Sequence, residues 1–296
     1  MIWGDVLENN KTVLITGGTS GIGLATAKLL ISQQYRVIII GSTQSKIDSV
    51  KGDIQSEYPH AEVAYFFADL SVQKSIYQLA EQIGQYLNIY CGGKLDVLIN
   101  NAGGVRDHYT ETPDGIEYQF ALNHLSGFLF SHTLLPYLHN GIILFTGSYS
   151  HQKAKIHWHN IFLKNRYFIF TAYRQSKLCN VMTAKYFNQI LSPMNIRSYV
   201  VDPGLVKTDI ASKHTSWLVR WVWSKRSIKG VSPDIPAKTY LYLIENRPLE
   251  GLYFIGEKAV SYNKTVDNPF LTKRLFELSE KLCNIDFLIS LPTSHL

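Results

Sequence analysis

A tyrosine and a lysine stand four residues apart in the stretch Tyr173-Arg174-Gln175-Ser176-Lys177. On a helix this spacing places both side chains on one face, about one turn apart. An ammonium group beside a phenol favours the phenolate, so a phenol with an ordinary pKa of about 10 could exchange its proton near neutral pH. The pair therefore predicts general acid–base chemistry.

The same spacing occurs in two other pairs, Tyr90/Lys94 and Tyr149/Lys153. The first spans a glycine turn and the second runs from an apolar strand into a polar loop, so neither pair need share a helix face. A surface tyrosine beside a solvated lysine is the simpler interpretation of both. Only the Tyr173 pair opens a helical pattern, with an apolar stripe of Leu178, Val181, Met182, Tyr186 and Phe187.

A glycine-rich turn, TGGTSGIG at residues 16–23, follows the first apolar strand and leads into a helical pattern. Glycines leave room for a pyrophosphate, and the N–H groups of a helix start attract an anion. A turn without a ligand is the alternative, but the strand–turn–helix context favours a dinucleotide cradle. Its candidate binding residues are Gly17, Thr19, Ser20, Gly21, Ile22 and Gly23.

The end of the second strand bears on the choice of cofactor. Proteins that bind NAD usually place an acid there for the ribose 2′-hydroxyl. Here Ser42 and Thr43 follow the strand, with Lys46 close behind and no acid. Hydroxyls and a lysine could accept a 2′-phosphate, so NADP(H) is favoured over NAD(H); capping of the next helix is the alternative. Asp69 could accept from the adenine amino group or cap the helix before Ser71.

Composition excludes several classes of function. The 296 residues carry a net charge of +6, without a basic block that would indicate nucleic-acid binding. No apolar run reaches the roughly 18 residues of a membrane span, and no signal peptide is evident. Cys91, Cys179 and Cys283 lie far apart, which favours a reduced, cytoplasmic setting and predicts no metal site. A peripheral membrane contact and a homo-oligomer are both compatible with this composition.

Apolar strands alternate with helical stretches along the chain. This order predicts a single α/β domain over residues 1–296, with a doubly wound (Rossmann) parallel sheet of about seven strands. The predicted strands are 12–15, 37–40, 63–67, 96–99, 141–146, 195–201 and 251–255, and the predicted helices are 21–33, 43–58, 71–90, 111–138 and 173–191. Residues 205–236 lack strand signals and are predicted to form a substrate lid.

Together these motifs resemble the short-chain dehydrogenase/reductase family over about residues 10 to 285. The resemblance rests on the glycine turn, Asp69-Leu70, NNAG at 100–103, Asn123, a serine after the fifth strand, the Tyr173/Lys177 pair, Pro203-Gly204 and Thr208. The insertion KIHWHN at 155–160 is similar to a stretch of the retinol-dehydrogenase-like branch. Members of that branch often carry an arginine where this chain has Ser42 and Thr43.

The resemblance implies a catalytic tetrad of Asn123, Ser148, Tyr173 and Lys177. Tyr173 would exchange the proton, Lys177 would lower its pKa and bind the nicotinamide ribose, and Ser148 would hold the substrate oxygen. Asn123 would support a water chain through Lys177, and Ser150 is a rival to Ser148. The implied cofactor contacts also include Leu70, Asn101, Ala102, Gly103, Pro203, Gly204 and Thr208.

The expected function is an NAD(P)-dependent oxidoreductase that interconverts an alcohol and an aldehyde or ketone. The apolar lid favours a lipophilic substrate. One alternative is a catalytically silent NAD(P)-binding sensor or scaffold. Another is a membrane-associated lipid binder, suggested by Trp217, Leu218, Trp221 and Trp223 beside basic residues.

Overall fold

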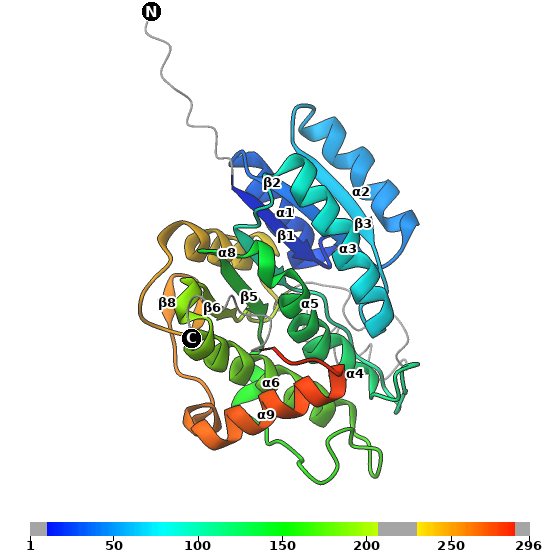
Figure 1. The fold of residues 1–296 in the computed structure, drawn as a ribbon, viewed down its shortest axis with the longest axis vertical. Coiled ribbons are helices and arrows are strands. Elements are labelled where there is room, and N and C mark those ends of the chain that lie inside the picture. The colour runs from blue at the N-terminus through cyan, green and yellow to red at the C-terminus, as the bar shows by residue number, and fades with distance from the viewer. Residues whose placement is uncertain (1–10, 207–229, 288–296) are drawn as a thin grey trace, which may run out of the picture.

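A single mixed sheet organises the protein (Figure 1), for which the computed structural model describes residues 11–206 and 230–287. The strand order within these residues is β3-β2-β1-β4-β5-β6-β7-β8. The strands are β1 (Thr12–Thr16), β2 (Arg36–Gly41), β3 (Val63–Phe67), β4 (Val97–Asn100), β5 (Ile142–Thr146), β6 (Arg197–Val201), β7 (Tyr253–Ile255) and β8 (Lys258–Ala259). All neighbours pair in parallel except β7 and β8.

Helices cover both faces of the sheet, which explains why the central strands are continuous runs of buried Val, Ile and Leu. One apolar cluster joins a sheet face to α1 (Gly21–Ser32), α2 (Gln44–Glu57) and α8 (Asp234–Asn246). The other joins the opposite face to α3 (Gln73–Tyr90), α5 (Ser126–Leu134) and α6 (Ile169–Ile190). Helix α9 (Pro269–Cys283) packs on α6 from outside (Figure 1).

The predicted doubly wound parallel sheet is confirmed, although its strand count was one short. The additional strand, β8, has only two residues, both exposed, and pairs antiparallel at the edge of the sheet. A short exposed edge strand buries no apolar face, so it carries no hydrophobic pattern that a sequence could reveal.

The predicted helix 111–138 is broken into several pieces. It consists of α4 (Tyr118–Phe120), the π-helical turn η1 (Ala121–Leu125), α5 and the 3₁₀ turn η2 (Leu135–Tyr137). A π turn inserts an extra residue and rotates the side chains that follow, which is frequent at functional sites. Helix α6 begins at Ile169, earlier than predicted, so Tyr173 lies in its second turn rather than at its start.

The ends of the predicted lid are described and its middle is not. Val206 and Val231 form a parallel bridge, and α8 begins at Asp234. Thr208 and the tryptophans of the lid lie among residues 207–229, outside the described residues.

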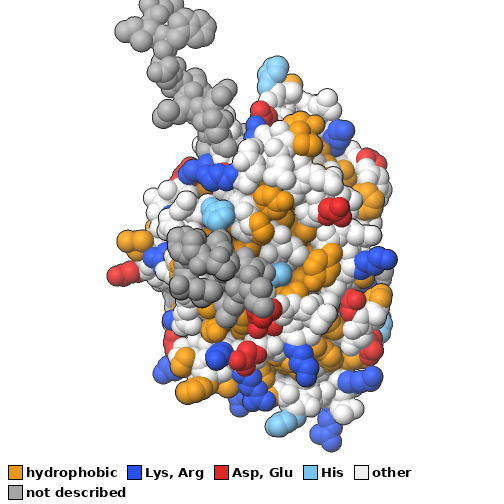
Figure 2. All heavy atoms as spheres, in the orientation of Figure 1, with side chains coloured by type: hydrophobic (Ala, Val, Ile, Leu, Met, Phe, Trp, Pro, Cys, Tyr) orange, Lys and Arg blue, Asp and Glu red, His pale blue; other side chains and the backbone are white. Residues whose placement is uncertain are grey.

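No helix within residues 11–206 and 230–287 combines the length and apolar content of a membrane span. On the face shown in Figure 2, Lys and Arg side chains are interspersed with Asp and Glu.

Candidate active site

A cleft of about 1020 Å³ opens at the carboxyl ends of β1 to β4. Most residues predicted from the sequence to bind the cofactor line it: Gly17, Thr19, Ser20, Gly21, Ile22, Gly23, Ser42, Thr43, Asp69, Leu70, Asn101, Ala102 and Gly103. The sequence did not point to several other lining residues, among them Lys28, Arg106, Tyr118, Leu122 and Asp234. Their side chains belong to no glycine or acid motif, and only the fold brings them to the cleft.

The glycine turn is closed so tightly that a side chain cannot enter it. Gly17 adopts a φ of +67°, which favours glycine. A Cβ on Gly23 would lie 2.2 Å from the carbonyl oxygen of Gly17. Ser20, the N-cap residue of α1, makes no side-chain capping bond, so the first N–H groups of this helix are left for an anion. This cradle fits a pyrophosphate.

Thr16 and Asn101 hold the cradle against the end of β4. The Thr16 hydroxyl oxygen accepts from the N–H groups of Asn101 at 2.9 Å and Ala102 at 3.0 Å. The Asn101 amide donates in return to the Thr16 carbonyl oxygen at 2.9 Å. These bonds fix the NNAG loop beside the glycine turn, which is the geometry that a shared ligand requires.

The end of β2 carries hydroxyls and a cation. Lys46 Nζ donates to Ser42 Oγ at 2.6 Å. Thr43 is the N-cap residue of α2, but its hydroxyl contacts Ser45 rather than a backbone N–H group. Side-chain capping of α2 therefore does not explain why a threonine stands at this position. Within the described lining of the cleft the acids are Asp69 and Asp234, and neither follows β2 directly.

Asp69 lies at the end of β3 and is not a helix cap. Its Oδ1 accepts from the backbone N–H of Ser71 at 2.9 Å and from the Ser71 hydroxyl at 2.6 Å. The N-cap residue of α3 is Val72. The carboxylate of Asp69 therefore stabilises a turn at the rim of the cleft, where it also lines the cavity.

Tyr173, Lys177 and Ser148 meet beside the end of β5. Tyr173 is 8% exposed and Lys177 is 3% exposed. The Tyr173 phenol forms a hydrogen bond with the Ser148 side chain. Ser150 Oγ donates to Ser148 Oγ at 3.0 Å, and Ser148 is the serine that is hydrogen-bonded to the phenol. Lys177 Nζ donates to the Thr146 carbonyl oxygen at 2.9 Å and lies 5.7 Å from the centre of the Tyr173 ring.

Burial dominates the proton affinities of this pair. Burial raises the pKa of Tyr173 to about 12, although the hydrogen bond with Ser148 opposes the shift. Burial also lowers the pKa of Lys177 to about 8. The expected lowering of the phenol pKa by Lys177 is not found in this geometry, because desolvation outweighs every favourable contact. Tyr173 therefore keeps its proton at neutral pH, as a proton donor must.

Asn123 lies in the π turn η1 and binds the loop after β4. Its amide donates to the Gly104 carbonyl oxygen at 3.0 Å and to Ser176 Oγ at 3.1 Å, and its Oδ1 accepts from Gly104 N at 2.8 Å. The side chain thus satisfies the backbone groups of Gly104 and contacts the Ser176 hydroxyl. The same contacts hold Gly103 close to Lys177, since a Cβ on Gly103 would lie 3.7 Å from Lys177 Nζ.

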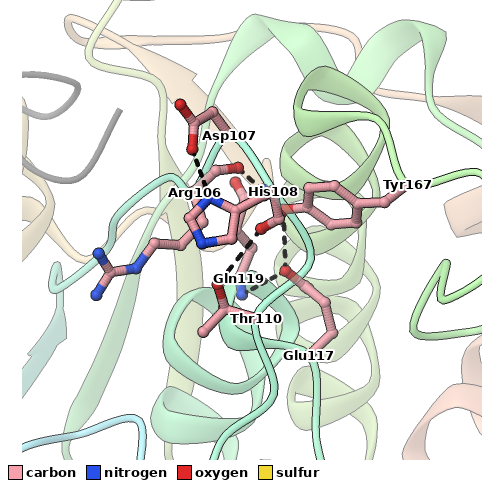
Figure 3. Close-up of polar contacts among 7 residues, drawn as sticks. All are labelled: Arg106, Asp107, His108, Thr110, Glu117, Gln119 and Tyr167. Carbon is pink, nitrogen blue, oxygen red and sulfur yellow. Dashed lines mark hydrogen bonds and ion pairs between the residues drawn. The ribbon is translucent and has the colours of Figure 1, made fainter. Parts of the chain in front are cut away.

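A second polar cluster connects the cleft wall with the start of α6 (Figure 3). The Tyr167 hydroxyl contacts the Arg106 carbonyl oxygen and Glu117 Oε1, each at 3.1 Å, and accepts from the Gln119 amide at 2.6 Å. Glu117 is buried, and burial raises the pKa of its carboxyl group. Arg106 points its guanidinium away from this cluster and stacks on Tyr118, 4.3 Å from the ring centre.

Asp202 and Tyr253 are also close to the site, and sequence reasoning missed both. Asp202 stands at the end of β6, directly before the predicted Pro203-Gly204 contact, and Tyr253 lies in β7. Their hydroxyl–carboxylate contact of 2.7 Å joins segments 51 residues apart. The one available signal in the sequence was a lone acid at the carboxyl end of a buried strand.

In the described part of the chain, His, Cys, Asp and Glu side chains form no group of three or more that could hold a metal ion.

Comparisons with known proteins agree with this geometry. The family described as short chain dehydrogenase matches residues 11–219. Mouse (Mus musculus) retinol dehydrogenase 12 is 31% identical over 94% of this chain and 87% of its own. Human (Homo sapiens) polyprenol dehydrogenase is 31% identical over 89% of this chain and 84% of its own. A short chain dehydrogenase from Burkholderia cenocepacia J2315, solved in complex with NADP, shares the fold, with a TM-score of 0.66 and 22% identity over 84% of this chain and 98% of that chain.

Proposed function

Because the chain belongs to the short-chain dehydrogenase family, is retinol-dehydrogenase-like and is therefore an oxidoreductase acting on CH–OH groups with NAD(P), we propose a specific reaction for it. It interconverts a lipophilic alcohol and its aldehyde or ketone, with Tyr173 as the general acid and base. The observation that carries this proposal is the hydrogen bond between the buried Tyr173 and Ser148, close to a cleft that is lined by the glycine turn.

The cleft residues fit an NAD(P) cofactor. The glycine turn and the free start of α1 would bind the pyrophosphate, and Lys177 would bind the nicotinamide ribose. The bound nicotinamide would supply or accept the hydride. Pro203 and Gly204 would border its amide group.

Tyr173 and Ser148 handle the oxygen atom of the substrate. In reduction, Ser148 orients the carbonyl oxygen and Tyr173 gives its proton to that oxygen. In oxidation, the Tyr173 phenolate removes the hydroxyl proton. Lys177 adds a positive charge close to the ring, and Asn123 keeps the loop at Gly103 against Lys177.

NADP(H) is the favoured cofactor. Ser42 and Lys46 are hydrogen-bonded to each other at the end of β2, where an NAD-binding protein usually presents an acid. A hydroxyl and an ammonium group both donate to a 2′-phosphate, and no carboxylate stands between Ser42 and Lys46 to repel it.

An apolar wall beside Tyr173 supports a lipophilic substrate. Val105, Ile169 and Phe170 pack with Tyr173 in one apolar cluster. Phe168, next to this cluster, is 55% exposed and stacks edge-on against Phe170. Such a wall gains free energy from a substrate in proportion to the apolar area that it covers. The names of two relatives, a retinol and a polyprenol dehydrogenase, point the same way.

The test is a series of straight-chain aldehydes of increasing length, reduced with NADPH. Catalytic efficiency should rise with each added methylene, by up to about fourfold per group, until the pocket is full. Phe170→Ala should flatten this trend, whereas Phe270→Ala, at a side chain that is 83% exposed on α9, should not. A flat series in the parent, or a clear preference for polyols, would contradict the lipophilic substrate.

A further inference from the structure

Asp202 is a buried carboxyl group that the proposed reaction does not use. Its residue is 3% exposed, and no Lys, Arg or His of the described residues forms an ion pair with it within 4.0 Å. Buried acids are rare unless they are paired, because desolvation of a charge is costly. Asp202 directly precedes Pro203-Gly204, so this buried carboxyl group lies beside the segment that is proposed to border the nicotinamide.

Both oxygens of this carboxyl group accept hydrogen bonds. The Tyr253 hydroxyl donates to Oδ2 at 2.7 Å, and the Gly204 N–H donates to Oδ1 at 2.9 Å. A hydroxyl and a backbone N–H are the two donors, so the carboxyl group is hydrogen-bonded on both oxygens without a cation. The effect of Asp202 on the pKa of Tyr173 and of Lys177 is that of a negative charge inside the protein at the end of β6.

Within residues 11–206 and 230–287, this charge acts on titratable groups of several elements. In each of them burial is the largest cause of a pKa shift, and the Asp202 charge raises the pKa. The groups are His151 from the 3₁₀ turn η3 (Tyr149–Lys153), Tyr173 and Lys177 from α6, Tyr240 from α8 and Tyr253 from β7. Burial lowers the pKa of His151, so Lys177 is the cation among them at neutral pH.

The same carboxylate also holds two turns of the site. Through Tyr253 it reaches Ser148, because the Tyr253 hydroxyl is hydrogen-bonded to the Ser148 backbone. His151 supports that turn from the other side, with its Nδ1 at 2.8 Å from the Ser148 carbonyl oxygen and its ring 4.5 Å from the Tyr253 ring. On its other oxygen, Asp202 fixes Gly204, whose φ is +68°.

We propose that Asp202 is a positioning residue of the active site: its buried negative charge acts on Lys177 and Tyr173, and its hydrogen bonds hold the Ser148 and Gly204 turns beside them. An opposite charge stabilises the Lys177 ammonium against desolvation. A like charge opposes the Tyr173 phenolate, so Asp202 keeps the phenol protonated and favours carbonyl reduction at neutral pH.

The direct test is the titration of Lys177, followed by NMR in protein labelled at the lysine side chains. Lys177→Arg identifies the signal. Lys177 should titrate at a pH of about 8 in the parent. In Asp202→Asn it should titrate about one pH unit lower, because loss of the negative charge disfavours the ammonium form.

Two controls separate charge from structure. Tyr253→Phe removes a hydrogen bond to Asp202 but leaves the charge, so it should shift the Lys177 titration by less than half as much. Asp267→Asn removes an exposed acid that pairs with Lys185 and should leave the titration in place. Asp202→Ser, which retains an acceptor for Gly204 N–H, repeats the measurement with a second neutral side chain. An unchanged Lys177 titration in both neutral variants would overturn the proposal.

A kinetic measurement extends the test to Tyr173 and rests on the proposed function. The rate of alcohol oxidation should rise with pH as the phenol ionises, and Asp202→Asn should move that rise about one pH unit lower. A purely structural role would reduce the rate without moving the profile. If the parent turns over no alcohol, the proposed function fails, whereas the NMR titration still decides the role of Asp202.

Discussion

The two halves of the carboxyl edge of the sheet are built from different materials. The half at β1 to β4 is a wide cleft whose shape depends on glycines and backbone N–H groups. The half at β5 to β7 is a set of buried side chains, Tyr173, Lys177 and Asp202, whose exposed fractions are 8%, 3% and 3%. A backbone cradle binds by shape, whereas buried ionisable groups act through charge and respond strongly to any change around them.

This difference predicts different failures on mutation. Changes in the cleft should alter cofactor affinity or choice and leave the chemical step intact for cofactor that still binds. Changes in the buried half should alter turnover or its pH dependence while cofactor binding survives. A cleft variant that slows the chemical step, or a variant of the buried half that loses cofactor binding, would contradict this division between the two halves.

The largest effect is expected for Tyr173→Phe. Turnover should fall by about a hundredfold or more, because the general acid is lost, while NADPH binding stays nearly unchanged. Steady-state kinetics and NADPH fluorescence titration measure the two quantities separately. Tyr149→Phe is the matched control, since Tyr149 belongs to a rival pair but is 66% exposed. Full activity in Tyr173→Phe would remove that residue from the mechanism.

The next effect belongs to the cleft. Gly23→Ala places a Cβ within 2.2 Å of the Gly17 carbonyl oxygen, so the glycine turn must move. If strain of about 1 to 3 kcal/mol falls on the cofactor-binding turn, NADPH binding should weaken by about five- to about 150-fold. Gly52→Ala is the control, because a Cβ there meets nothing within 4 Å. Equal NADPH affinity in both variants would show that the turn does not bind the cofactor.

Cofactor choice should change with a single charge at the end of β2. Ser42→Asp should shift the ratio of NADPH to NADH affinity by about tenfold or more toward NADH, through repulsion of the 2′-phosphate and a new bond to the ribose. Ser49→Asp, the same change on an exposed residue of α2, should leave the ratio unaltered. Tighter binding of NADH than NADPH in the parent would contradict the stated preference.

The smallest effect concerns the contact between the halves. Tyr167→Phe removes the hydroxyl that joins Glu117 to the Arg106 loop (Figure 3). The free energy of unfolding should fall by about 1 to 2 kcal/mol, because a buried carboxyl group loses a donor. Urea unfolding measures it, with Tyr109→Phe as the control, whose partner Glu111 is exposed. Turnover should change only a few-fold; a loss comparable to that of Tyr173→Phe would make Tyr167 part of the chemistry.

Sequence patterns predicted the elements that repeat a simple period. The buried strands have continuous apolar runs, so β1 to β6 were located to within about two residues of their observed ends. The π turn at Ala121–Leu125 and the edge strand β8 could not be predicted in this way. The first depends on tertiary contacts of Asn123, and the second buries nothing.

The site residues, like the secondary structure, could be predicted where a local pattern marks them and not where the tertiary fold alone brings them together. The residues of the glycine turn and the Tyr173/Lys177 pair were found because their chemistry fixes a local spacing. Asp202 and Tyr253 were missed, since their contact exists only when β6 and β7 lie side by side. The direction of the Tyr173 pKa shift was missed for a related reason: burial comes from the whole fold and has no local signature.

The central claim is that Tyr173 and Lys177 act in the interconversion of a lipophilic alcohol and its carbonyl compound. Tyr173 would exchange the proton, and NAD(P) would exchange the hydride. The most direct test follows NADPH and NADH consumption by the parent protein with a long-chain aldehyde, after NADPH binding has been measured in the same sample. We predict rapid, aldehyde-dependent consumption of NADPH, greater than that of NADH. Tight NADPH binding without consumption, across long-chain aldehydes, ketones and the reverse reaction with alcohols, would contradict the account and favour a cofactor-binding sensor or scaffold.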